Sequence, residues 1–451
     1  MRGTSARLTT LVAATALTAA LAGAPAVAAV DTIVVRPTEF SQGITIECPI
    51  PDIVRGPDGN LWIAEYSNHS IGRVTPQGLV SEFGIGDPAD AWGLPASIAV
   101  GPDKNIWFVT LGGRVGRMTT QGQPTLFEDG ITGFKNEIAG WYDLSAVQPP
   151  SIARGPDGNL WFTELGPTIG RITPQGQVTE FDAGANATAV ETTEALSLGR
   201  FGGITAGPDG NLWFTELRGA VGRITPQGQV TEFDAGISDG SVPQSIVAGP
   251  DGNLWFTELF GGRIGRITTK GVVTEFGLDP GSTPQGIDTG PDGALWFAAR
   301  GSRALGRITT AGAITLYTHQ SNPYWQPSAV TGGAGSTVWF ARTGVVGILD
   351  PAKDGLGSTS DPVGTTPLPA IDTRTPTARK LRLEGRRLSM VLSERATVTA
   401  RAEGHTVRWH LHAGAVAVRV PLWFARVARR GVMLVLSDAS GNERRTFVRG
   451  R

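Results

Sequence analysis

The stretch GPDGNLWFTE, which runs from Gly155 to Glu164, decides the fold of this chain. The same ten residues recur at Gly207–Glu216 and at Gly249–Glu258, and looser copies occur elsewhere. One tryptophan marks each of seven copies, with 41 to 54 residues between neighbours: Trp62, Trp107, Trp161, Trp213, Trp255, Trp296 and Trp339. A repeat of about forty residues, built from short apolar runs and Gly/Pro turns, indicates a propeller or a solenoid.

One copy of the repeat predicts four short strands. In the third copy the extended runs are residues 151–153, 160–163, 169–173 and 178–181. Tight turns join the first pair and the last pair, because proline presets φ and glycine accepts a positive φ in such loops. The second run, 160–163, is apolar on both faces, so both faces must be covered. The repeat is therefore a four-stranded antiparallel meander.

Stacking copies of this meander buries both faces, and a closed ring leaves no uncovered end. Seven copies predict an all-β, seven-bladed β-propeller over residues 31–350, with each repeat tryptophan packed between blades. A β-solenoid is the alternative, although its repeats are usually shorter. The seventh copy ends near Leu349 without a Val-Thr-Glu-Phe strand, and residues 33–40 carry an unassigned strand. We expect this N-terminal strand to complete the seventh blade.

The two ends of the chain predict export and a second domain. Residues 1–29 have a basic start, an apolar middle and a small-residue cleavage site, as a signal peptide does. The mature protein is expected to be secreted, extracellular or associated with the cell envelope, without a transmembrane segment.

Cys48 is the one cysteine and is expected to be a buried apolar residue. A net charge of −1 gives no signal for nucleic-acid binding.

A linker and a small basic domain follow the propeller. Residues 351–376 are rich in Gly, Ser, Thr and Pro, as linkers are. Residues 377–451 contain alternating apolar and polar runs, which predict a small β-sandwich-like domain. From Arg374 onward, 17 Lys/Arg stand against 5 Asp/Glu. This excess either solvates the domain surface or attracts an anionic polymer of the cell surface.

The irregular loops of the repeat are the expected working face, because variable loops on a rigid scaffold carry function. They lie between blades and between the second and third strands. Aromatic residues there are expected either to stack on a ligand or to anchor the loops: Trp141, Tyr142, Tyr324 and Trp325. Four second strands end in glutamate on this face: Glu65, Glu164, Glu216 and Glu258. These carboxylates either pair with arginines of the third strands, such as Arg171, or bind a divalent cation, for which Glu65 and Glu258 are the candidates.

The repeated GPDGNLWFTE…IGRIT…G…TEF pattern closely resembles the virginiamycin B (streptogramin B) lyase family over residues 40–349. The resemblance implies a seven-bladed propeller that opens a cyclic depsipeptide lactone by elimination. It also implies Mg²⁺ as the cofactor, a histidine that removes the proton next to the ester carbonyl, and acidic residues near the metal.

Four positions depart from the family pattern that the resemblance implies. The family's histidines would precede the first strands of the last two blades, where this chain has Gln285 and Ser328. Its acidic residue before the last histidine corresponds to Gln326, and its glutamate in the last blade corresponds to Arg342. Neither an amide nor a serine hydroxyl is a base at neutral pH. The lyase chemistry is therefore not expected to carry over with the fold.

Two functions remain open on this sequence. The first is a secreted binding propeller whose ligand, a small molecule or an envelope component, lies at the channel mouth against the loop aromatics, Gln285 and Arg342. The alternative is a metal-dependent lyase or hydrolase that opens a lactone at a relocated site. That site would use Glu65, His69 and His319, since blades seven and one are neighbours in a closed ring.

Overall fold

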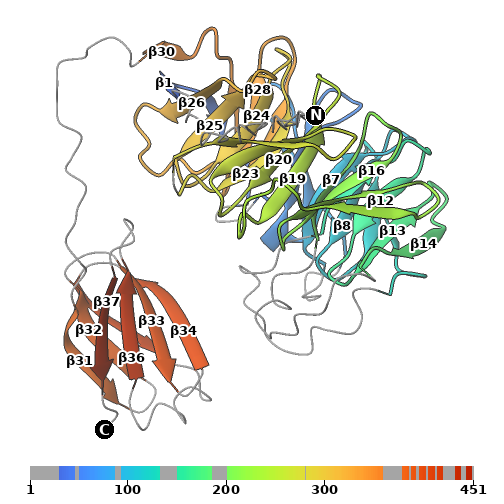
Figure 1. Ribbon diagram of the computed structural model, residues 1–451. Helices are drawn as coiled ribbons and strands as arrows, with labels where there is room; N and C mark the ends of the chain where they lie inside the picture. Colours follow the sequence, from blue (N-terminus) through green and yellow to red (C-terminus); the bar gives the residue numbers. More distant parts are fainter. Residues whose placement is uncertain are drawn as a thin grey trace, which may run out of the picture. The chain divides into compact units, whose positions relative to one another are not determined.

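In the computed structural model the repeats form seven β-sheets, six with four strands and one, the sheet of blade six, with six strands (Figure 1). The chain divides into two compact units, Met1–Asp361 and Pro362–Arg451. The structure describes residues 30–45, 50–86, 93–132, 150–184, 201–279 and 281–358, and seven strands between residues 378 and 448. The predicted signal peptide and Cys48 lie outside the described residues.

The seven blades are antiparallel meanders, as the repeat predicts. Blade one contains β3 (Ile53–Arg55), β4 (Leu61–Glu65), β5 (Ser70–Val74) and β6 (Val80–Gly84). Blade two contains β7 (Pro95–Val100), β8 (Ile106–Thr110), β9 (Val115–Met118) and β10 (Pro124–Phe127). Blade three contains β11 (Ile152–Arg154), β12 (Leu160–Thr163), β13 (Thr168–Ile172) and β14 (Val178–Asp182). Blades four and five contain β15 (Phe201–Ala206), β16 (Leu212–Glu216), β17 (Ala220–Ile224) and β18 (Val230–Phe233); and β19 (Pro243–Ala248), β20 (Leu254–Glu258), β21 (Arg263–Ile267) and β22 (Val273–Gly277). Blades six and seven contain β23 (Pro284–Thr289), β24 (Leu295–Ala299), β25 (Ala304–Ile308) and β26 (Ile314–His319); and β27 (Ala329–Gly332), β28 (Val338–Arg342) and β29 (Val345–Leu349).

The N-terminal segment closes the ring in a way that the sequence predicts only in part. Strand β2 (Thr38–Phe40) pairs antiparallel with β29 and is the fourth strand of blade seven, as expected. Strand β1 (Asp31–Val35) instead pairs parallel with β26 and extends blade six. It also pairs with β30 (Gly355–Ser358) at its other edge. The segment therefore holds two neighbouring blades together.

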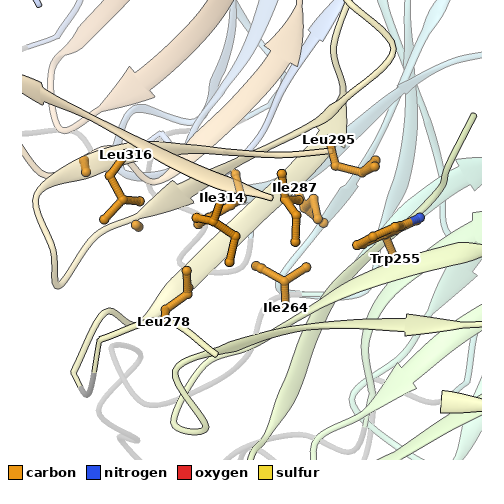
Figure 2. Close-up of a cluster of buried hydrophobic side chains, with 11 residues drawn as sticks. Trp255, Ile264, Leu278, Ile287, Leu295, Ile314 and Leu316 are labelled. Carbon is orange, nitrogen blue, oxygen red and sulfur yellow. The ribbon is translucent and has the colours of Figure 1, made fainter. Parts of the chain in front are cut away.

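Each repeat tryptophan packs between its own blade and the next, which confirms the expected core. Trp255 of blade five is fully buried against Leu295 and Phe297 of blade six. Figure 2 shows this cluster, in which Ile287, Ile314 and neighbouring aliphatic side chains fill the space around Trp255. The same contact closes the ring, since Trp339 of blade seven packs with Leu61 and Ile63 of blade one. An aromatic side chain buries roughly 150–250 Å² in such a position.

The Pro-Asp-Gly turn holds the tryptophan in place. In the third repeat, Trp161 Nε1 donates to Asp157 Oδ1 at 3.1 Å, and Asn159 Nδ2 donates to Asp157 Oδ2 at 2.8 Å. Burial acts against ionisation of Asp157, but these hydrogen bonds outweigh it and hold its pKa below the usual value. Gly158 closes the turn at φ 80°, a conformation that favours glycine.

Arg171, Arg223 and Arg266 of the third strands donate to carbonyls of the next blade, and each is opposite the repeat tryptophan instead of the second-strand glutamate. Arg171 lies 5.6 Å from the Trp161 ring centroid and donates to the Pro226 carbonyl of the next blade at 3.0 Å. The register explains why: Arg171 is opposite Trp161, at the other end of the blade from Glu164. The expected glutamate–arginine pairing is therefore wrong.

The C-terminal unit contains two antiparallel sheets. One consists of β31 (Ala378–Glu384), β32 (Arg387–Leu392) and β35 (Gly414–Arg419). The other consists of β34 (His405–Leu411), β33 (Ala396–Ala402), β36 (Val432–Ser437) and β37 (Glu443–Val448). Their packing as a sandwich stays a prediction. None of the helical segments in the described residues has the length and apolar character that spanning a bilayer requires.

Candidate functional site

The first strands of the blades surround a cavity of about 620 Å³. The residues that begin or precede these strands contribute to its wall in all seven blades: Asp52, Ser97, Ser151, Gly203, Ser245, Gln285 and Ser328. The loops between the second and third strands form its rim, which includes Tyr66, Leu217, Phe260 and Arg300. The cavity therefore opens on the face that the sequence predicts to be the working face.

Most of the polar side chains in the wall are neutral hydrogen-bonding groups. The amides of Gln244, Gln285 and Gln326 line it together with four serines. Two charged side chains are among the described lining residues, Asp52 and Arg300, and none of these lining residues is a histidine. Such a wall can donate and accept hydrogen bonds while its neutral groups keep their protonation state over a wide pH range.

Asp52 is a hydrogen-bonded carboxylate in the cavity wall. Its Oδ2 accepts from Ser97 Oγ at 2.7 Å and from Ile98 N at 3.0 Å, and its Oδ1 accepts from Ile53 N at 2.9 Å. The bonds from Ser97 and Ile98 join blade one to blade two. Burial raises the pKa of Asp52 to about 6 in spite of them, and the charge of Asp288 acts in the same direction.

Two strained residues precede the glutamine positions of the wall. Val242 and Thr283 have φ values of 56° and 40°, in the left-handed region that β-branched residues avoid. Each is followed by proline and glutamine, so Gln244 and Gln285 occupy equivalent places in adjacent blades. Backbone strain of this kind persists where the surrounding structure enforces it, and it gathers at functional sites.

The rim loops of blades five and six are anchored to the same strained segments. The Leu259 amide donates to the Val242 carbonyl at 3.0 Å, and the Phe260 amide donates to the Ser241 carbonyl at 3.0 Å. In blade six, the Gly301 amide donates to Thr283 Oγ1 at 2.8 Å. The loops that carry Phe260 and Arg300 are therefore held at fixed positions.

Of the residues that the sequence predicts to bind a ligand, some line the cavity and others do not. Gln285 lines the cavity, as expected. Tyr324 is 66% exposed, but it is not among the lining residues, and the Arg303 guanidinium lies 5.9 Å from its ring centroid. Trp141 and Tyr142 lie outside the described residues.

Trp325 and Arg342 are structural residues, which corrects their predicted role. Trp325 is fully buried and packs edge-on against Phe340. Its Nε1 donates to Glu39 Oε1 at 3.0 Å, and Arg342 forms two hydrogen bonds of 3.0 and 2.9 Å to the same carboxylate. Since Glu39 belongs to β2, this cluster fastens the N-terminal strand to blade seven.

The structure does not bring Glu65, His69 and His319 into one cluster. His319 ends β26, the outer strand of the blade-six meander, and its Nδ1 accepts backbone hydrogen bonds from Ser321 and Asn322. His69 follows the short helix η1 (Tyr66–Asn68) of blade one and borders a hole of about 10 Å³ beside Thr110. None of the three is among the lining residues of the large cavity.

Glu65 and Glu258 are buried acids in separate blades, each beside a second carboxylate. Burial, with the neighbouring Glu82, raises the pKa of Glu65 to about 8. Burial, with the charge of Glu275, raises the pKa of Glu258 to about 8. Glu82 accepts a hydrogen bond from Thr45 N at 2.9 Å.

The described side chains do not fit the Mg²⁺ that the resemblance implies. Among them, no group of three or more His, Cys, Asp or Glu is arranged to hold a metal ion. Glu65 and Glu258 belong to blades one and five, which are not adjacent, so they form no common site. A carboxyl group that keeps its proton near neutral pH is also a poor cation ligand.

Sequence reasoning missed four residues of the mouth: Asp52, Tyr66, Phe260 and Arg300. A signal for Asp52 was available, because Pro51-Asp52-Ile53 matches Pro150-Ser151-Ile152 at the start of blade three. A signal for Arg300 was also available. The residue that follows the tenth position of the repeat motif is aromatic or aliphatic in blades one to five and is arginine in blade six.

Known proteins share this architecture. A model of the virginiamycin B lyase family matches residues 22–141 and 142–355. A virginiamycin B lyase from Nocardia farcinica (strain IFM 10152) is 32% identical over 221 residues, which cover 48% of this chain and 65% of that protein. The match thus spans less than two thirds of that relative.

Solved structures agree with this match. A streptogramin B lyase is 30% identical with a TM-score of 0.58, over 69% of this chain and 96% of that one. A virginiamycin B lyase from Staphylococcus aureus with quinupristin, a catalytically inactive variant in which one histidine is replaced by alanine, is 29% identical with a TM-score of 0.58, over 69% and 98%. This chain belongs to the virginiamycin B lyase family.

Proposed function

We propose that this protein is an exported propeller that binds a ligand in the cavity at its mouth without the elimination chemistry of the lyases. The observation that carries the proposal is the cavity wall. Gln285 and Ser328 line it at the positions where the resemblance implies histidines, and no described lining residue is a histidine. The described part of the wall offers hydrogen bonds for recognition and no imidazole base.

The chemistry of the two positions supports binding. Elimination needs a group that accepts a proton near neutral pH, and an amide such as that of Gln285 does not. The Ser328 hydroxyl donates to the Ile50 carbonyl at 2.8 Å, which ties it to blade one. A related lyase with one histidine replaced by alanine is described as catalytically inactive and was solved with quinupristin. Loss of the histidine in this chain is consistent with retained binding.

One observation favours a second candidate, which is turnover of a lactone by Asp52. Burial brings the pKa of this wall carboxylate to about 6, close to the range in which a general base works best. In that case Asp52→Asn would abolish product formation while the variant still melts cooperatively. The three hydrogen bonds that Asp52 accepts favour its structural role.

Export and surface attachment are also part of the proposal. Residues 1–29 have the pattern of a signal peptide, and the arginine-rich segment from Arg374 onward would attract an anionic cell-surface polymer. Release of the full chain from cell walls by moderate salt supports the attachment, because exposed charge attraction is screened by salt. Retention that does not change with salt contradicts it.

Isothermal titration calorimetry with quinupristin tests the binding. Ser245→Trp places a large side chain in the cavity, so it should abolish binding that the wild type shows. Gln121→Trp is the matched control, because Gln121 is exposed in a turn between third and fourth strands, at the opposite end of a blade. Equal binding by both variants would show that the ligand does not occupy the cavity. If the wild type does not bind quinupristin, this ligand is excluded.

A further inference from the structure

Arg300 is the one cationic side chain among the described lining residues of the cavity. Asp52 and Arg300 are the charged side chains among the described lining residues. Asp52 already accepts three hydrogen bonds. Within the described residues, the Arg300 guanidinium forms no hydrogen bond or ion pair, and its side chain is exposed. Within the part of the chain that the structure describes, a ligand that enters the cavity therefore meets a guanidinium without a side-chain partner.

Arg300 interrupts the repeat at a position where the fold does not require a charge. The equivalent residue after the second strand is Tyr66 in blade one, Leu217 in blade four and Leu259 in blade five, and all of these line the cavity. In blade six the second strand ends in Ala299, so no glutamate precedes the arginine. The cation thus has no partner built into its own blade.

The backbone that carries Arg300 is fixed before any ligand binds. The Gly301 amide donates to the Ser282 carbonyl at 2.9 Å, and the Arg303 amide donates to the Arg300 carbonyl at 3.1 Å. A Cβ at Gly301 would collide with the carbonyl oxygen of Gly281, so this tight approach requires glycine. A preorganised loop lowers the conformational cost of binding.

An exposed aromatic ring stands in the corresponding loop of the adjacent blade. Phe260 is 67% exposed and lines the same cavity. Leu259, beside it, also lines the cavity. An exposed phenyl ring at a cavity rim offers a face for a flat apolar group.

We propose that the mouth selects amphiphilic anions, in which a carboxylate or phosphate is joined to an aromatic ring. The anion binds the Arg300 guanidinium, whose planar donors suit both oxyanions, and the ring packs on Phe260. This proposal rests on the proposed function, because it names the class of ligand that the same cavity takes.

Three small probes test the selection by isothermal titration calorimetry on the full mature chain: 2-naphthoate, 2-naphthyl phosphate and the neutral 2-naphthamide. We expect the anions to bind about tenfold more tightly than the amide, as a charge-assisted hydrogen-bonded pair provides. A comparison of the two anions shows which oxyanion the mouth prefers. Equal affinity for the amide and for both anions overturns the proposal, and so does failure of all three probes to bind.

Matched variants locate the selection. Arg300→Gln should remove the preference for anions and leave the affinity for 2-naphthamide unchanged. Phe260→Ala should weaken all three probes. Arg218→Gln is the control, because Arg218 is exposed in the equivalent loop of blade four and is not among the lining residues. An anion preference that survives in Arg300→Gln, or that is lost in Arg218→Gln, contradicts the assignment.

The Ser245→Trp variant separates failure of this inference from failure of the proposed function. If the wild type binds quinupristin in a cavity that Ser245→Trp blocks, but shows no preference among the probes, only the anion selectivity is wrong. If Ser245→Trp binds quinupristin as the wild type does, the cavity is not the site, and both proposals fall.

Discussion

Replacement of Glu258 by glutamine should remove much of the pH dependence of the stability of the propeller. Glu258 is fully buried, and burial, with the charge of Glu275, raises its pKa from 4.5 to about 8. Glu275 accepts hydrogen bonds from Ser238 N at 2.6 Å and Ser238 Oγ at 2.7 Å. Glu258 therefore keeps its proton in the folded protein.

The sign and size of the effect follow from proton linkage. Between about pH 5 and pH 7.5 the folded state holds a proton at Glu258 that the unfolded state has lost. The free energy of unfolding of the wild type therefore falls with rising pH, and this group contributes about 1.4 kcal/mol per pH unit. Glutamine has no proton to lose in this range. The free energy of unfolding of Glu258→Gln, relative to that of the wild type, should therefore rise by roughly 3 kcal/mol from the lower to the upper end of the range.

Urea unfolding followed by tryptophan fluorescence, at several pH values, measures the effect. The quantity of interest is the difference in unfolding free energy between variant and wild type, because the other titrating groups cancel in it. Glu232→Gln is the control, since Glu232 is an exposed glutamate on the outer strand of blade four. A difference for Glu258→Gln that stays constant with pH would refute the reasoning, because it would mean that Glu258 is ionised in the fold.

Three further changes test the packing. Asp157→Ala removes the hydrogen-bond acceptor of the Trp161 indole, so it should lower the free energy of unfolding by about 1–3 kcal/mol. A loss below about 0.5 kcal/mol, which is typical of a surface substitution, would contradict the role of the turn in holding Trp161. Arg342→Met leaves Glu39 without its bidentate partner and should lower the free energy of unfolding by about 1–3 kcal/mol. Arg342→Lys should restore only part of this loss, because lysine lacks the planar guanidinium. An unchanged unfolding midpoint for Arg342→Met would argue against the stabilising role of the Glu39 cluster. Deletion of residues 31–40 removes the fourth strand of blade seven, so cooperative thermal unfolding should be lost, and calorimetry that gives a wild-type transition contradicts the ring closure.

The repeat made the architecture predictable, because each copy carries its own turn residues, its buried tryptophan and its alternating outer strand. The expectation that Thr38–Phe40 would complete blade seven is confirmed. The place of Ile33–Val35 was not predictable in the same way. Its apolar residues suit any exposed sheet edge, and only the folded ring decides that the edge of blade six is the one available.

The functional site was less predictable, since the orientation of a loop side chain depends on its neighbours. Trp325 looks like a ligand-stacking residue in sequence, yet it is fully buried and donates its indole N–H to Glu39. In sequence, Arg342 stands where the family resemblance implies a glutamate. In the structure it pairs with Glu39 of the outermost strand of its blade. The pairing joins residues 303 positions apart, which no local pattern could reveal.

The most direct test of the central claim is chromatography with mass detection on quinupristin incubated with the mature protein, with and without Mg²⁺. The account predicts that the lactone is recovered intact, while calorimetry on the same sample detects its binding. A linear product of unchanged mass and new retention would show elimination, and a product heavier by one water would show hydrolysis. Either product, formed by the wild type but not by Ser245→Trp, would contradict the claim that this mouth binds without turnover.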